Sequence, residues 1–278
     1  MFDYKTITPN TFLTARFEKT PTGDIKVVDK ESGTEVGIVC IVDNVPTSLE
    51  PEALNCYNLW AGRPERRVGQ LVNWEGRSLD QLMTMYEELL VGAYLLRFPE
   101  TEINPEDSMY AKMIDWLRST DFYRAPASTQ YHESIVGGLL IHSLKVYNEA
   151  IVLNRLPKFR KVPIASVALA ALCHDWCKIN TYVSYMRNVK NEETGQWEKV
   201  DAFKREYSGL TFGHGVTSMF YAMRYMPDLT EEEAAAIRWH QGRWNVCDAE
   251  LNEFQRCNEI YPLVHLVQFA DQLAIVQY

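Results

Sequence analysis

The chain has 278 residues, 46% of them hydrophobic, and a formal net charge of −9. A chain of this length can bury a full hydrophobic core, and its sequence contains no apolar run approaching the length of a membrane-spanning helix. The acidic charge argues against a broad basic surface that follows an extended nucleic acid, and it favours small anionic substrates screened by bound cations. The first residues lack the features of a secretory signal, so we expect a cytoplasmic protein with no membrane partner.

Short runs of β-branched and aromatic residues alternate with turn sequences between residues 12 and 43, which predicts an antiparallel meander of three strands. Residues 46–76 contain scattered Pro, Asn and Gly and predict no regular element. We therefore expect residues 1–77 to form a small β-containing region. Its role is open: an oligonucleotide-binding barrel needs five strands, and a docking or oligomerisation element is at least as well supported.

The pattern changes to helical at residue 78, and residues 78–278 predict a mainly α-helical domain. Ser78 and Gln81 form a capping-box sequence before apolar residues at helical spacing, and Asn104 with Pro105 predicts the start of a second helix. Further helices are expected near residues 135–153, 163–178, 212–226, 230–240 and 259–276.

Two shorter patterns lie within this domain. Thr230 and Glu233 form a second capping-box sequence. Residues 182–204 alternate in the manner of two strands around the turn sequence NEETG, which predicts an inserted β-hairpin. Its place in the chain makes the hairpin a candidate lid.

Four of the six histidines and two aspartates occur in an order that suggests metal chemistry, because imidazole and carboxylate are ligands of divalent cations. Asp175 follows the apolar run VALAALCH, where an unpaired carboxylate would cost several kcal/mol. Lys178 lies three residues later on about the same helical face, so a simple ion pair would also account for the aspartate. The candidate metal ligands are His142, His174, Asp175, His214, His240 and Asp271.

The six cysteines show neither a CxxC pair nor the spacing of a disulfide framework. Cys173 and Cys177 flank the His-Asp pair, but no other cysteines at motif spacing complete a zinc site. We therefore expect reduced thiols. His265 lies six residues before Asp271 and points away from it on a helix, so we interpret His265 as a packing or surface residue.

The sequence motifs around the candidate ligands resemble those of a known protein family. The sequences are PASTQYHES at 126–134, GGLLIHSLKV at 137–146, HDWCK at 174–178 and FADQLA at 269–274. In this order they resemble the HD superfamily of metal-dependent phosphohydrolases, and the first resembles the branch of HD-type 3′-to-5′ exoribonucleases and relaxase-associated HD domains. The resemblance covers roughly the C-terminal half to two-thirds of the chain, and it implies an HD-domain helical bundle.

The resemblance also implies a ligand set and a chemistry. His142, His174, Asp175 and Asp271 would hold one divalent ion, and Asp175, His214 and His240 a second. The metal would be Mn, Fe, Ni, Co, Zn or Mg, and a hydroxide bridging two ions would attack phosphorus.

Other residues are candidates for contact with the substrate. By the same resemblance Lys178, helped by His132, would contact the phosphate and neutralise the leaving oxygen, although His132 could instead be a loop residue bonded to its own backbone. Arg243 and Trp244 could bind a phosphate and stack on a base, and Arg124 lies beside the PAS sequence. For these three, an ordinary surface position is the simpler interpretation.

Three functions follow from these observations. The first is a phosphohydrolase that acts on a nucleotide or another small phosphoester. The second is a 3′-to-5′ exonuclease on single-stranded RNA or DNA, which the motif context favours and the acidic charge opposes. The third is a catalytically silent, nucleotide-sensing binding module. The complete ligand set and Lys178 argue against the third.

Overall fold

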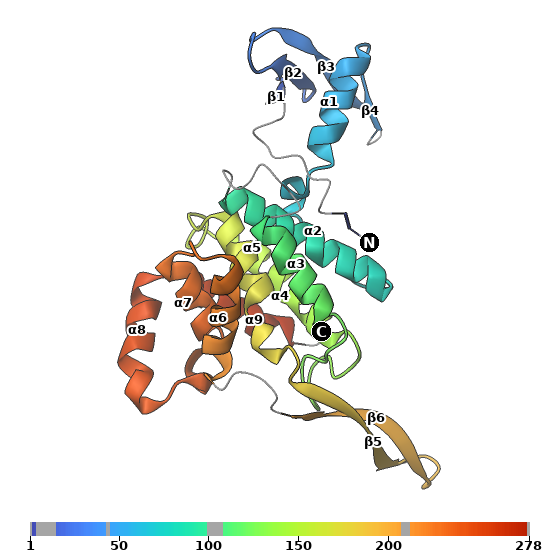
Figure 1. Ribbon diagram of the computed structural model, residues 1–278, viewed down its shortest axis with the longest axis vertical. Helices are drawn as coiled ribbons and strands as arrows, with labels where there is room; N and C mark the ends of the chain where they lie inside the picture. The colour runs from blue at the N-terminus through green and yellow to red at the C-terminus, as the bar shows by residue number, and fades with distance from the viewer. Residues whose placement is uncertain (1, 4–14, 43–44, 99–107, 207–211, 277–278) are drawn as a thin grey trace.

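The structure is a computed structural model that describes residues 2–3, 15–42, 45–98, 108–206 and 212–276. It is mainly α-helical, with two small antiparallel sheets, and it has a β-containing unit at the N-terminal end, as expected. Figure 1 shows three parts along the long axis: this N-terminal unit, a helical body and a projecting hairpin.

The helical body is built around α5 (Ile164–Cys173), which packs against α2, α4, α7 and α9. The sequence IASVALAALC is apolar on every side, as is typical of a helix surrounded by others. The surrounding helices are α2 (Leu79–Arg97), α3 (Met109–Ser119), α4 (Gly138–Asn154), α6 (His214–Tyr225), α7 (Glu231–Trp239), α8 (Leu251–Ile260) and α9 (Pro262–Ala274).

The end of α5 is anchored by a buried aromatic network. Trp176 is fully buried in a short 3₁₀ turn after α5 and donates a hydrogen bond to the Tyr86 hydroxyl of α2, with an N–O distance of 3.0 Å. Tyr86 in turn donates to the carbonyl oxygen of Leu172, at 2.8 Å. These bonds satisfy both polar aromatic groups and fix the backbone on either side of residues 174 and 175.

Two helices begin with the caps that the sequence predicted. Both capping boxes are confirmed: Ser78 accepts from the backbone of Gln81, and Thr230 accepts from that of Glu233. The predicted start at Asn104 and Pro105 lies outside the described residues, and α3 begins after Ser108 as its N-cap. The helix expected from residue 259 begins at Pro262, and α8 before it was not predicted.

The N-terminal unit contains an antiparallel sheet in the order β1 (Ala15–Lys19), β2 (Ile25–Asp29), β3 (Glu35–Val42) and β4 (Val45–Thr47). The helix α1 (Pro51–Ala61) packs on it, so one side of the sheet has a small core of Ala15, Val27, Val39 and Ala53. The sequence predicted three of these strands and missed β4 and α1. Within the described residues this sheet has four strands in an open order, fewer than the five of an oligonucleotide-binding barrel.

The segment between α1 and α2 packs on the helical body. Gly69 N–H donates to the Tyr147 hydroxyl on α4, at 2.8 Å. Asn148 bonds both backbone groups of Val72, at 2.9 and 2.8 Å. The proposed domain boundary at residue 77 therefore follows a stretch that is already fixed to α4, and the boundary remains a prediction.

The predicted hairpin is present as β5 (Tyr182–Lys190) and β6 (Trp197–Arg205), which pair antiparallel from Tyr182–Arg205 to Lys190–Trp197. Most of its side chains are exposed, and it projects away from the helical body instead of lying across it (Figure 1). Only its base lies near the candidate ligands: Tyr182 interacts electrostatically with Lys178, and Arg205 with Cys177. Among the described helices, none combines the length and the apolar character needed to cross a membrane.

Candidate metal centre

The fold brings the six candidate metal ligands together from five helices. His142 is on α4, His174 caps the end of α5, and Asp175 follows it directly. The remaining three ligands come from the helices around α5: His214 is the first residue of α6, His240 caps the end of α7, and Asp271 is on α9. The end of the central helix is thus the point where the ligands converge.

The carboxylate of Asp175 lies between two pairs of histidines. Its Oδ2 is 3.5 Å from His142 Nε2 and 3.3 Å from His174 Nε2. Its Oδ1 is 2.9 Å from His214 Nε2 and 3.6 Å from His240 Nε2. Each oxygen therefore faces its own pair of imidazole nitrogens.

Asp271 adds a second carboxylate beside the His142–His174 pair. Its Oδ1 lies 3.1 Å from His142 Nε2 and 3.9 Å from His174 Nε2. Three sets among the described residues have ligand atoms close enough to hold a metal ion at this centre: His142–His174–Asp175, His174–His240–Asp271 and Asp175–His214–His240. The third set is the one that the resemblance implied for a second ion.

Backbone carbonyls orient two of the imidazoles. His174 Nδ1 lies 2.7 Å from the carbonyl oxygen of Ala171, and His240 Nδ1 lies 2.7 Å from that of Ile237. Each carbonyl is three residues before its histidine at a helix end, where it lacks an ordinary helical partner. With Nδ1–H donated in this way, Nε2 faces the centre, where it holds either a proton or, in the neutral imidazole, a metal ion.

A thiol lies beside a third imidazole. The Cys177 Sγ is 3.1 Å from His214 Nδ1, on the side of the ring away from the centre. Burial raises the pKa of this thiol, so it stays protonated at neutral pH. The thiol is thus a hydrogen-bonding partner of the ring, and all six cysteines are free in the structure.

The four imidazole nitrogens require something positive between them. His142 Nε2 and His174 Nε2 are 3.3 Å apart, and His214 Nε2 and His240 Nε2 are 3.1 Å apart. Facing lone pairs at these distances repel each other unless a proton or a cation lies between them. Imidazole nitrogens with carboxylate oxygens are a donor set for divalent transition metals, so the residues fit a bound metal.

Burial keeps two of the histidines neutral. Burial lowers the pKa of His142, and it lowers the pKa of His214 to about 4. Neutral imidazole is the form that coordinates a metal ion. Both side chains are therefore ready to act as ligands at neutral pH without first losing a proton.

The carboxylates are held ionised. Burial alone would raise the pKa of Asp175, but the Lys178 ammonium, 2.6 Å from its Oδ2, and His174 outweigh burial and hold the pKa well below its usual value. Burial likewise opposes ionisation of Asp271, and the hydrogen bond with His142 and the charge of His174 outweigh it. The ion pair between Lys178 and Asp175 that the sequence suggested is present.

His132 lies at the edge of the centre, in the loop before α4. Its ring centroid is 4.9 Å from that of His142, and burial is the main cause of a pKa lowered to about 4. Among the described residues, the buried Nε2 of His132 has no hydrogen-bond partner, so this nitrogen makes no bond to the loop backbone.

The other three predicted substrate contacts, Arg124, Arg243 and Trp244, are not among the residues grouped at the centre. Arg124 is exposed, and Arg243 donates to the Val246 carbonyl and pairs with Asp248. Trp244 is 93% exposed. Arg243 and Trp244 line an open hollow of about 550 Å³ between the end of α7 and α8–α9, and none of the six candidate ligands is among its lining residues.

His265 also lines this hollow, stacked on Phe269 and away from the centre, in keeping with its interpretation as a packing residue.

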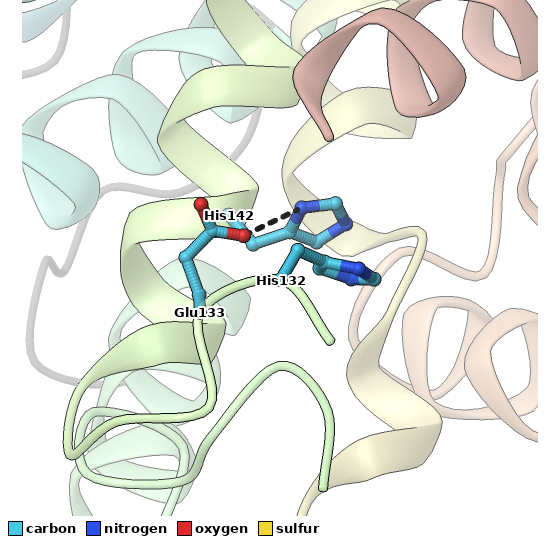
Figure 2. A group of neighbouring side chains, drawn as sticks. All are labelled: His132, Glu133 and His142. Carbon is cyan, nitrogen blue, oxygen red and sulfur yellow. Dashed lines mark ion pairs between the residues drawn. The ribbon is translucent and has the colours of Figure 1, made fainter. Parts of the chain in front are cut away.

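Sequence reasoning missed one charged residue at the centre. Glu133, next to His132, turns its carboxylate towards the other side of the His142 ring, with Oε2 3.9 Å from Nδ1 (Figure 2). Lys145 pairs with the other carboxylate oxygen. A glutamate in a loop sequence usually indicates an exposed side chain, and only the return of the loop over α4 places this one inside.

Comparisons of the chain with protein-family models, with curated proteins and with solved structures found no match. The conclusion at this point therefore rests on the chain itself: it contains a buried cluster of histidines and aspartates that can hold metal ions.

Proposed function

We propose that the protein is a metal-dependent phosphohydrolase that acts on a nucleotide or another small phosphoester, and that it holds two divalent ions. The observation that carries the proposal is the position of Asp175, whose two carboxylate oxygens each face a separate pair of histidines. The HD-superfamily resemblance of the motifs around these ligands supports the same chemistry. Two divalent ions at such a centre supply Lewis-acid stabilisation of a phosphoryl group and activation of water.

Lys178 is the proposed electrostatic partner of the phosphate. Burial would lower the pKa of its ammonium group, but Asp175 outweighs this and raises the pKa, so the side chain stays charged. Its Nζ is fixed at 2.6 Å from the carboxylate at the middle of the centre. A fixed positive charge there stabilises negative charge that develops on a phosphoryl group without reorganising during the reaction.

His132 has a more limited proposed role than the resemblance implied. With a pKa lowered to about 4, the imidazole is neutral at pH 7 and brings no positive charge. It can still donate one hydrogen bond to the leaving oxygen or to a phosphate oxygen. Its unpaired, buried Nε2 beside His142 supports this position for a substrate contact.

Arg243, Trp244 and Arg124 remain proposed contacts for the rest of the substrate. Gly242 lines the same hollow as Arg243 and Trp244 and is two residues beyond His240, so a nucleotide held at the centre could reach it. Stacking on the exposed indole of Trp244 would suit a base. The Arg243 guanidinium already has two protein partners, which weakens its case.

The exonuclease alternative is supported by the resemblance of residues 126–134. The net charge of −9 and the open four-stranded sheet of the N-terminal unit do not favour it. The cytoplasmic location and the absence of a membrane partner also remain predictions.

The test is a turnover screen of the full chain loaded with Mn²⁺. It covers nucleoside mono- and triphosphates, cyclic mono- and dinucleotides and short oligonucleotides, with an Asp175→Asn variant as the control for contaminating phosphatases. Hydrolysis that the variant lacks would support the proposal, and its substrate would separate the small phosphoester from the oligonucleotide. A metal-loaded chain that binds nucleotides and hydrolyses none of the panel would instead indicate the nucleotide-sensing module.

A further inference from the structure

His142 differs from the other three candidate ligand histidines in the partner of its outer nitrogen. His174 and His240 bond backbone carbonyls through Nδ1, and His214 contacts a thiol. His142 Nδ1 is buried and has no hydrogen-bond partner among the described residues. The ring itself is 1% exposed, so bulk water does not satisfy this nitrogen.

The nearest complementary atom is equally unsatisfied. Glu133 Oε2 is buried, has no hydrogen-bond partner within the described part of the chain, and lies 3.9 Å from His142 Nδ1. This distance is too long for a direct hydrogen bond. A small rotation of the glutamate side chain, or one buried water between the two atoms, would satisfy both.

Backbone contacts fix Glu133 in a position from which its side chain faces His142. Its carbonyl oxygen accepts the Ala127 N–H at 3.1 Å, and a Cβ on Gly138 would lie only 1.9 Å from the same oxygen. The residue also has a φ of 44°, which a non-glycine residue adopts at some cost. The loop therefore crosses the start of α4 in a conformation that turns this side chain towards His142.

We infer that Glu133 is a positioning residue for His142, accepting its Nδ1–H directly or through one water and thereby directing Nε2 at the metal. The inference rests on the proposed metal-dependent function. It implies that His142 is the one ligand histidine oriented by a carboxylate, since the other three have neutral partners. A carboxylate partner fixes the tautomer and makes the imidazole a stronger donor.

A further cation is the competing interpretation, because ligand atoms of His132, Glu133 and His142 lie within 4.8 Å of one another. The charges argue against it. Lys145 already pairs with Glu133, and the charge of Lys178 acts on His132. A proton shared between Glu133 and His142 satisfies the unpaired atoms without adding positive charge to this corner.

The test uses the full chain and Zn²⁺, with affinity measured by chelator competition and metal content by elemental analysis. Glu133→Gln keeps the shape and a neutral acceptor, and Glu133→Asn shortens the side chain while tolerating a positive φ. Glu149→Gln, on the same helix as His142 but outside the centre, is the matched control for loss of one charge. Circular dichroism and thermal unfolding establish that each variant is folded.

We expect Zn²⁺ affinity to fall about 10- to 100-fold in Glu133→Asn, by a smaller factor in Glu133→Gln, and not at all in Glu149→Gln, with the metal content at saturation unchanged. In ¹⁵N-histidine-labelled protein, the Nδ1–H signal of His142 should shift in both Glu133 variants. A purely structural role of the glutamate would leave that signal in place.

Unchanged affinity together with an unchanged Nδ1–H signal would overturn the inference. Loss of one metal equivalent in Glu133→Gln would also overturn it, in favour of a further cation. If the wild-type chain binds no Zn²⁺ at all, the proposed function fails and the inference fails with it, whereas Zn²⁺ binding by the wild type that both Glu133 variants retain unchanged overturns the inference alone.

Discussion

A Cβ atom on Gly215 would lie 1.8 Å from the main-chain carbonyl oxygen of Arg238, so α6 and α7 meet through a contact that only glycine permits. Gly215 follows His214, and Arg238 is two residues before His240. The close approach of the two backbones thus places the two Nε2 atoms 3.1 Å apart. The geometry of the proposed second ion depends on this one missing methyl group.

Gly215→Ala should therefore weaken binding of the second ion more than binding of the first. The new methyl group forces α6 away from α7, and overpacking of this kind costs about 1–3 kcal/mol of stability. Metal titration followed by elemental analysis should show one tightly held equivalent and one weakened. Gly62→Ala, whose Cβ would lie 3.2 Å from the Asn58 carbonyl, is the control, and equal binding of both ions in Gly215→Ala would refute the prediction.

Removing both His214 and His240 should remove one of the two metal equivalents. We expect two equivalents in the fully loaded wild-type chain and one in the double variant His214→Ala plus His240→Ala, because His142, His174 and Asp271 are untouched. Elemental analysis of dialysed, metal-loaded protein measures this. One equivalent in both proteins would sink the two-ion centre while leaving a one-ion enzyme in place.

Substitutions of Asp175 and Lys178 should have different effects on metal binding and on the rate of hydrolysis. Asp175→Ala removes the carboxylate shared by both histidine pairs, so it should weaken metal binding and abolish hydrolysis. Lys178→Ala should keep the metal content and lower kcat by about 10²-fold, the usual effect of removing one group that stabilises transition-state charge. Full activity of Lys178→Ala on the true substrate would mean that the lysine is only the ion-pair partner of Asp175.

Glu233 should contribute to stability above pH 4.5 and progressively less below it. Burial opposes ionisation of this side chain, but hydrogen bonds from Arg97 and Ser166, at 2.8 and 2.6 Å, outweigh burial and lower its pKa below the usual 4.5. The folded pKa lies below the unfolded one, so the contribution is complete above 4.5 and disappears as pH falls through the folded pKa.

Glu233→Gln should accordingly reduce the free energy of unfolding at pH 7 by about 1–3 kcal/mol, because Arg97 and Ser166 lose a charged partner. Urea unfolding of wild type and variant at pH 7 and at several lower pH values measures the difference. The difference should shrink with acidification. A constant difference across this range would show that the carboxylate is not ionised in the folded protein.

The size of the substrate should determine how strongly its affinity depends on salt concentration. A small nucleotide contacts few charges, so its affinity should change little with ionic strength, whereas a long single strand would release many counterions and lose affinity steeply. Given the net charge of −9, we expect the shallow dependence. A steep logarithmic slope for an oligonucleotide, reduced by deleting residues 1–76 while the remaining domain stays folded, would instead make the N-terminal unit a nucleic-acid-binding module.

Features that depend on a few neighbouring residues could be predicted from the sequence. The caps at Ser78 and Thr230 are decided within one turn, and the apolar sequence of α5 by itself predicts a buried helix. The helix α1 was missed although Ala53, Leu54, Tyr57 and Trp60 recur at helical spacing, because Pro and Asn around them indicate loops. Its apolar face became decisive only with a sheet to cover.

The residue types of the metal centre could also be predicted, since imidazoles and carboxylates in an apolar context are costly to bury unless they bind a cation or pair with one another. Their pairing could not. Which histidines share an oxygen of Asp175 depends on how closely α6 approaches α7, and the contact between Glu133 and His142 depends on a loop crossing α4 at Gly138. Sequence alone determined the candidate ligands and most of the helices because these are local properties, whereas only the tertiary structure decided distances between atoms of residues far apart in the chain.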